Sequence, residues 1–291
     1  MIKKLFIALL VFFGLAITLN KPEVLYAQEE ASQEAVATSE GELILSETLI
    51  KERETARIQE LRILYRDQVE VYRNSEKAFA IAKTNYQNVQ TLSALEEAVT
   101  AGKTVFTDRS RVMITYLELL DAVLIETNGI ELDLKDQSHT ELFGLINALK
   151  IHQDAIIVSR DRQELATLAD DFEPIATSYQ SAVYKALSLV RIGKIQEVHD
   201  KSKIIKIDIV SEHDAQEVGP VTTARRERAY AEIERNFDTV NGSLVKLNGL
   251  FLEAKRDGFS RSFYERILKD LGPVYAQISR SMDHLGELIA L

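Results

Sequence analysis

Residues 230–251 read YAEIERNFDTVNGSLVKLNGLF, and this stretch decides the fold class. Its apolar residues alternate three and four positions apart without a gap: Tyr230, Ile233, Phe237, Val240, Leu244, Leu247 and Phe251. An α-helix with this a/d spacing presents one apolar seam that packs knobs into holes against another helix. Asn241-Gly242 alone would favour a turn, but the seam continues on both sides of it. The sequence therefore predicts one continuous helix inside a bundle.

Glycine and proline mark the two ends of this helix. Gly219-Pro220 breaks the chain before it, and Asp257-Gly258 ends it. The segment from Phe259 to Leu291 carries another apolar seam, and a kink is expected at Gly272-Pro273. Its expected core residues are Phe263, Ile267, Leu271, Val274, Ile278, Leu285 and Ile289.

The first part of the chain predicts a long helical hairpin over residues 47–128. Aromatic residues recur every seven positions along an expected helix at about 47–90: Tyr65, Tyr72, Phe79 and Tyr86. Ser93-Ala-Leu-Glu96 has the capping-box pattern that starts a helix. Asn128-Gly129 stops this second helix. Two long helices joined by a short turn lie antiparallel.

The middle of the chain gives less regular signals. Ser138-His-Thr-Glu141 is a second capping box, for a helix that continues to about Val158. Asp161-Arg-Gln-Glu164 predicts the start of a short helix that ends by Phe172, ahead of Pro174.

Two later segments of this middle part predict more helix. Between Ala182 and Ile192 the only polar residues are Lys185, Ser188 and Arg191, so this helix belongs in the middle of a bundle. Residues 202–210 could form a strand or continue the helix. We favour the helix, because no partner strand is evident.

Together these patterns predict an all-α fold. Only four Pro and 12 Gly occur in 291 residues, so long helices meet few breakers. We expect an elongated antiparallel bundle of five or more helices over residues 47–291, with coiled-coil-like seams. The hairpin 47–128 forms its first part and the helices of 129–291 form the rest.

Residues 1–27 have the layout of an export signal. A basic start, Met1-Ile2-Lys3-Lys4, precedes an apolar run at 5–19, and Ala27 is a small residue at which a signal peptidase could cut. The run is shorter than the roughly 20 residues that span a bilayer. Leu25, however, is not the small residue of an ideal cleavage site, so an uncleaved N-terminal membrane anchor remains the alternative. We expect an extracytoplasmic protein that is secreted, periplasmic or at the cell surface, with residues 28–46 as an acidic flexible spacer.

Composition excludes several classes of site and partner. The absence of Cys rules out disulfides, thiolate metal sites and cysteine nucleophiles. The net charge of −10 becomes −12 without residues 1–27, which hold three Lys and one Glu. An acidic surface disfavours nucleic acid and anionic lipid as partners. No later run is apolar enough to span a membrane, so membrane contact is expected only through an uncleaved N-terminal segment.

Motifs for catalysis or metal binding are incomplete. The Glu-x-x-His pattern of di-iron bundles does not occur, and Asp136-Gln-Ser-His139 is its nearest relative. Ser243-Leu-Val-Lys246 has the Ser-x-x-Lys spacing without its companion motifs. Ala101-Gly102-Lys103-Thr104 lacks the upstream glycine of a phosphate-binding loop, since Glu97 stands there. We therefore predict no catalytic, metal-binding or cofactor-binding residue and no cofactor.

The other four histidines are expected to lie solvated on polar helix faces. They are His152, His199, His213 and His284, and none has another His within four residues. Each adjoins an acidic or amide residue, which favours this interpretation over a metal site.

Basic residues on both sides of the 211–220 loop form the one candidate binding patch. They are Lys201, Lys203, Lys206, Arg225, Arg226 and Arg228. Such a patch could bind an anionic cell-wall polymer or an acidic partner. The alternative is a solvated face whose charges compensate helix ends. Arg225-Arg226 near a helix N-terminus opposes the macrodipole, which slightly favours the binding role.

The sequence predicts a non-enzymatic exported scaffold that presents helix surfaces to a protein partner. Its seams could be completed within the chain or by a second copy. The alternative is an extracytoplasmic small-molecule-binding or sensory bundle, which needs a cavity with convergent polar groups.

Overall fold

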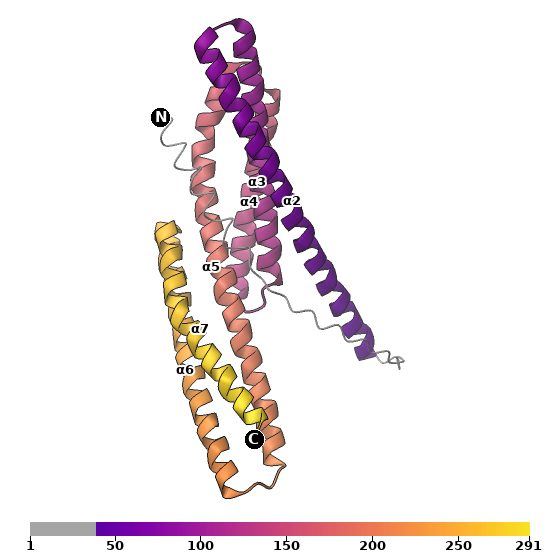
Figure 1. Cartoon of the computed structure of the whole chain (residues 1–291), viewed down its shortest axis with the longest axis vertical. Helices are drawn as coiled ribbons and strands as arrows, with labels where there is room; N and C mark the ends of the chain where they lie inside the picture. Colours follow the sequence, from indigo (N-terminus) through magenta and orange to yellow (C-terminus); the bar gives the residue numbers. More distant parts are fainter. Residues whose placement is uncertain (1–38) are drawn as a thin grey trace. The chain divides into compact units, whose positions relative to one another are not determined.

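A computed structural model describes the backbone of residues 39–291 as an all-α bundle (Figure 1), which confirms the predicted fold class. Side chains are described for these residues except 39–52, 252 and 255–257. The described part contains six helices: α2 (Ser39–Val89), α3 (Leu92–Glu126), α4 (Leu132–Val158), α5 (Arg162–Asp214), α6 (Pro220–Asp257) and α7 (Arg261–Ile289). The predicted export signal and most of the predicted spacer lie outside the described residues.

The chain divides into two compact units, Met1–Thr48 and Leu49–Leu291. The described part of the first unit is the beginning of α2, which starts at Ser39 rather than at residue 47. All packing described below lies within the second unit.

Neither of the two predicted capping boxes caps a helix. The cap of α3 is Thr91, whose Oγ1 accepts a hydrogen bond from the Ala94 amide at 3.3 Å, and not Ser93. α4 begins at Leu132, so Ser138 lies buried inside the helix. Glu141 does not fold back on Ser138, because its carboxylate pairs with Lys185 of α5. The Ser-x-x-Glu pattern therefore does not mark the first residue of either helix.

Asp161 does cap α5, as predicted, but the helix does not end at Phe172. The Asp161 carboxylate accepts hydrogen bonds from the Gln163 and Glu164 amides at 2.8 and 2.9 Å. Pro174 deprives the helix of one amide donor, yet α5 continues through it to Asp214. Pro174 lies on the exposed face, where water can satisfy the freed carbonyl.

Three predictions for the later part of the chain are confirmed and one is wrong. Residues 202–210 are helical within α5, and the whole seam of α6 is continuous across Asn241-Gly242. Gly219 precedes the N-terminus of α6, and Gly258 ends it with φ of 76°, a conformation that glycine adopts without strain. In α7, Ile289 is exposed and Leu288 occupies the core in its place, which corrects the last predicted core residue.

The first two helices form the predicted antiparallel hairpin. Tyr65 of α2 stacks on Tyr116 of α3 with ring centroids 5.3 Å apart. Further along, Phe79 of α2 meets Phe106 of α3 at 6.4 Å. As the residue number rises on α2 it falls on α3, which defines the antiparallel direction.

α5 packs on four other helices. Its N-terminal part lies against α3 and α4 and its C-terminal part against α6 and α7 (Figure 1), and the two sets of contacts overlap between Ser181 and Gly193. Tyr184 of α5 stacks on Tyr264 of α7 at 5.6 Å, whereas Lys206 forms an ion pair with Glu234 of α6. The segment from Ala182 to Ile192 is largely buried, as its composition predicted, although its polar residues Lys185 and Ser188 are buried too.

The α3–α4 turn contacts α5 backbone to backbone. A Cβ atom added to Gly129 would collide with the Gly193 carbonyl, and one added to Gly193 would collide with Ile130 and Thr127. Both glycines are therefore required for this close approach. The contact lies at the region where α5 passes from its first set of neighbours to its second.

Adjacent residues on α6 give a matched test of the seam. Leu244 is 1% exposed and Val245 is 65% exposed. We expect Leu244→Ala to lower the free energy of unfolding by about 2–5 kcal/mol, because it leaves a cavity. The control Val245→Ala should change it by less than about 0.5 kcal/mol. Chemical denaturation measures both, and equal effects would contradict the seam.

Candidate functional site

The predicted basic patch is partly engaged in ion pairs within the chain. Lys201 pairs with Glu197 at 2.7 Å, one helical turn earlier on α5. Lys206 pairs with Glu234 of α6 and so joins two helices. Lys203 is half-buried, and these contacts do not indicate which kind of partner it would bind.

Arg226, a member of the predicted patch, is bonded within the chain. It is buried, and its Nη2 donates to the Gln216 side chain at 2.8 Å and to the Leu291 carbonyl at 2.9 Å. Arg226 thus ties the α5–α6 connection to the end of α7. Arg225 and Arg228 remain exposed.

Two of the five histidines are buried, which corrects the prediction that all but His139 lie on solvated faces. His152 on α4 donates from Nε2 to the Leu168 carbonyl of α5 at 2.8 Å. His199 is fully buried. The prediction relied on polar sequence neighbours, but adjacent residues on a helix point about 100° apart. A polar neighbour therefore says little about the face that a histidine occupies.

His199 lies in the core shared by α5, α6 and α7. Its ring contacts Phe237 of α6 edge to face, with centroids 5.0 Å apart. Neither ring nitrogen has a hydrogen-bond partner within the described residues. Burial lowers the pKa of His199, and Lys203 on the same helix lowers it further, while Asp200 opposes the shift. The neutral ring is therefore the form that this core accommodates.

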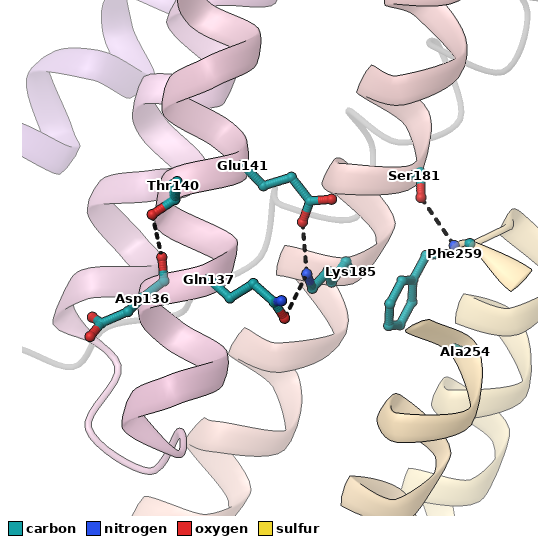
Figure 2. Close-up of a pocket in the computed structure, with 9 residues that line it drawn as sticks. Asp136, Gln137, Thr140, Glu141, Ser181, Lys185, Ala254 and Phe259 are labelled. Atoms are coloured by element: carbon teal, nitrogen blue, oxygen red, sulfur yellow. Dashed lines mark hydrogen bonds and ion pairs between the residues drawn. The ribbon is translucent and has the colours of Figure 1, made fainter. Parts of the chain in front are cut away.

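A cleft with a volume of about 560 Å³ opens beside Lys185 (Figure 2). This volume lies within the range of small-molecule pockets, roughly 300–1,000 Å³. Helices α4, α5 and α6 and the α6–α7 connection supply its lining: Asp136, Gln137, Thr140, Glu141, Ser181, Lys185, Ala254, Gly258 and Phe259.

A nearly buried ammonium group is the main polar feature of this cleft. The Lys185 side chain is 9% exposed, and its Nζ lies 2.7 Å from Glu141 Oε2 and 3.4 Å from Gln137 Oε1. Figure 2 shows these groups converging from α4 onto α5. Opposite them, the Phe259 amide donates to Ser181 Oγ at 3.0 Å, which holds the aromatic ring at the cleft. The site thus combines both signs of charge with an apolar wall.

Sequence reasoning missed the Lys185 cleft, although one signal was present. Lys185 is a charged residue within the apolar run of residues 182–192, and a buried lysine needs an acidic partner. The identity of that partner depended on the register of α4 against α5. Glu141 had been interpreted as part of a capping box instead.

Arg109 forms a second cationic feature, half-buried between α3 and α5. Its guanidinium carbon lies 3.7 Å from the Phe172 ring centroid and 4.9 Å from that of Phe106. Burial lowers its pKa to about 10. Its Nε and Nη2 have no hydrogen-bond partner within the described part of the chain. The two rings therefore provide its electrostatic stabilisation through cation–π contacts.

Two kinds of feature are absent from the part of the chain that the structure describes. No group of three or more His, Asp or Glu side chains there is arranged to hold a metal ion. None of the helices over residues 39–291 has a stretch both long and apolar enough to cross a membrane.

Comparison of the chain with models of protein families, with curated proteins and with solved structures gives no match.

His199 predicts a pH dependence of stability. Because its folded-state pKa lies below the unfolded value of about 6.5, its contribution to stability is complete above that pH and is lost as the pH falls toward the folded pKa. We expect His199→Leu to make the free energy of unfolding less sensitive to pH between about 7 and 5, by up to about 1.4 kcal/mol per pH unit. Denaturation curves at several pH values measure this. Parallel pH profiles for the two proteins would contradict it.

Proposed function

We propose that this protein is an exported, non-enzymatic scaffold, secreted or associated with the cell envelope, that binds another protein through an exposed helix face. One observation carries the proposal: large apolar side chains gather on the outer face of α4. Phe143 is 58% exposed, Ile151 is 72% exposed and Val158 is 73% exposed.

These residues lie on the side of α4 that faces away from the bundle. The buried residues of α4 include Leu142, Ile146 and Leu149, which point toward α3 and α5. With about 100° between successive residues, Phe143 and Val158 fall roughly 120° or more from the middle of that buried face. Single exposed apolar residues are ordinary, but several on one face favour a protein contact.

Charge on the same face defines the chemistry of the partner. Asp133, Asp136 and Asp154 are exposed on α4 and lie near the same side as Phe143. A partner surface that combines apolar and basic side chains complements this face. An acidic protein with a net charge of −10 also attracts such a partner over distance.

The export part of the proposal rests on the pattern of residues 1–27. A basic start, a short apolar run and a small residue at position 27 are typical of a segment recognised for secretion. These residues lie outside the described part of the chain, so the helices of α2–α7 support the binding role alone.

Site-specific photo-crosslinking in the producing cells tests the proposal. A photoreactive residue at Phe143 or Ile151 should trap the same protein, because both side chains lie on the proposed contact face. The matched controls are Val221 and Val245 on α6, which are equally exposed. Mass spectrometry of the product identifies the partner and shows whether the chain begins at Gln28.

Three results would contradict this function. They are the absence of a product at both α4 positions, identical products from the α6 controls, and a chain found only in the cytoplasm. Phe143→Asp should reduce the specific product and change the thermal midpoint little, since the side chain is exposed.

The Lys185 cleft favours a second candidate function, the binding of a small zwitterionic molecule of amino-acid size. Lys185 could contact a carboxylate group, Asp136 or Glu141 an ammonium group, and Phe259 an apolar side chain. A molecule of this class matches both charges and the aromatic wall.

A thermal-shift measurement with a panel of amino acids and short peptides tests this second function. A ligand at 100 times its dissociation constant should stabilise the protein by about 2.7 kcal/mol. Lys185→Met should abolish the shift, whereas Lys246→Met on α6, outside the cleft, should retain it. A panel without any shift, or a shift unchanged in Lys185→Met, would contradict binding at this cleft.

A further inference from the structure

α7 carries two apolar seams, and the bundle buries only one of them. The buried seam consists of Phe263, Ile267, Leu271, Val274, Ile278, Leu285 and Leu288. The second one, here called the outer seam, consists of Leu268, Gly272, Tyr275, Ser279, Met282, Gly286 and Ile289. Its members also alternate four and three residues apart, and all of them are exposed. A seven-residue repeat of this kind is the pattern of a helix–helix contact.

Large and small residues alternate along the outer seam. Its large members include Tyr275, which is 49% exposed, and Ile289, which is 70% exposed. A Cβ atom added to Gly272 or Gly286 would meet nothing within 4 Å, so the space above each glycine is open. Glycine inside an exposed helix costs about 1 kcal/mol relative to alanine, which calls for a compensating role. Gaps at these positions let another helix approach closely.

The outer seam is complementary to itself in the antiparallel direction. Around a two-fold axis at residue 277, residues whose numbers add to 554 face each other. Leu268 then faces Gly286 of a second copy, and Tyr275 faces Ser279. Met282 faces Gly272 in the same way. Leu268, Tyr275 and Met282 thus each meet a small side chain, whereas Ile289 falls opposite Glu265 at the end of the pair. Each pairing occurs twice by symmetry, as an isologous interface requires.

Charges beside the seam agree with this register. Lys269 and Asp283 are exposed on the free flank of α7. On this flank the nearest residues are those whose numbers add to 552, slightly offset from the 554 of the seam. Lys269 therefore lies near Asp283 of the second copy, and the reverse contact repeats it. Ala276, also exposed, meets its own symmetry mate beside the axis, where a charged residue would repel itself.

The ends of the same register bring Glu265 near Glu287 of the second copy. Glu265 already pairs with Arg261 at 2.8 Å, which reduces the repulsion. Glu287 lies 3.3 Å from His284. The end contacts therefore weaken the pairing less than two isolated carboxylates would.

α5 extends the apolar surface beside the outer seam. Ser202 of α5 lies 3.9 Å from the Met282 sulfur, which places this stretch of α5 next to α7. Val198 and Ile205, one turn on either side of Ser202, are both exposed. They widen a contact that runs for about 32 Å along α7 between residues 268 and 289. A contact made mainly by one helix of this length buries an area at the low end of that of specific protein interfaces, so we expect a reversible dimer.

We infer that the outer seam of α7 is a self-association surface on which the α7 helix of a second copy packs antiparallel. This surface differs from the α4 face, so a second copy on α7 leaves that face free. Loss of the α7 contact therefore leaves the α4 contact in place, and loss of the α4 contact leaves the α7 contact in place.

Two glycine substitutions separate dimer formation from folding. Gly272→Gln with Gly286→Gln fills the gaps of the seam and raises helix propensity. We expect this variant to weaken dimerisation at least about tenfold, equivalent to 1.4 kcal/mol, while its thermal midpoint as a monomer does not fall. Sedimentation velocity of the mature chain over a concentration series measures the dissociation constant. A protein that is monomeric at every concentration, or a variant that dimerises as the wild type does, would overturn the inference.

Single cysteines determine the direction and register, because the chain has no Cys. Ala276→Cys should form a disulfide-linked dimer under oxidation. Lys269→Cys and Asp283→Cys should each remain monomeric alone and form a mixed disulfide when combined. Thr239→Cys on α6 is the exposed control. Crosslinking of Lys269→Cys with itself would indicate a parallel pair, and linkage of Ala276→Cys to a different protein would indicate another occupant; either result would overturn the inference.

Discussion

The continuity of α5 is the constraint on which the rest of the structure depends. One helix of 53 residues supplies a face to α3 and α4 and then to α6 and α7. Its residues beyond Pro174 join the two sets of helices, since Lys185 pairs with Glu141 of α4 and the neighbouring Tyr184 contacts Tyr264 of α7. Gly193 matters for the same reason, since it lets the α3–α4 turn reach the α5 backbone.

Buried polar groups lie where helices meet, and each restricts how they meet. Lys185 requires the carboxylate of Glu141, so it fixes the register of α4 against α5. Arg109 lies close to the rings of Phe106 and Phe172, from two different helices. Burial of a charge adds little net stability, but a wrong register would leave that charge unpaired at a cost of several kcal/mol. Such residues therefore specify the packing more than they strengthen it.

Periodic patterns were predictable from the sequence, and contacts between distant residues were not. The a/d seam around Val240 needs only the spacing of one helix, so both the helix and its buried face could be predicted. Pro174 was misinterpreted because the carbonyl that it leaves without an amide donor lies on a solvated face. The local sequence does not reveal which face that is. His199 and Lys185 occupy faces set by the neighbouring helices, so their burial and partners became visible only in the packed structure. The outer seam of α7 was hidden behind the more apolar inner one.

The sharing of α5 also has a consequence for the order of folding. The α3–α4 and α6–α7 hairpins join residues that are close in sequence, so each can form rapidly with little loss of chain entropy. Neither hairpin buries its apolar face alone, and each needs a different half of α5. Nucleation at either end of α5 lets the helix propagate toward the other end, since elongation is easier than initiation. The two cores should therefore form sequentially, with α5 carrying order from the first core to the second.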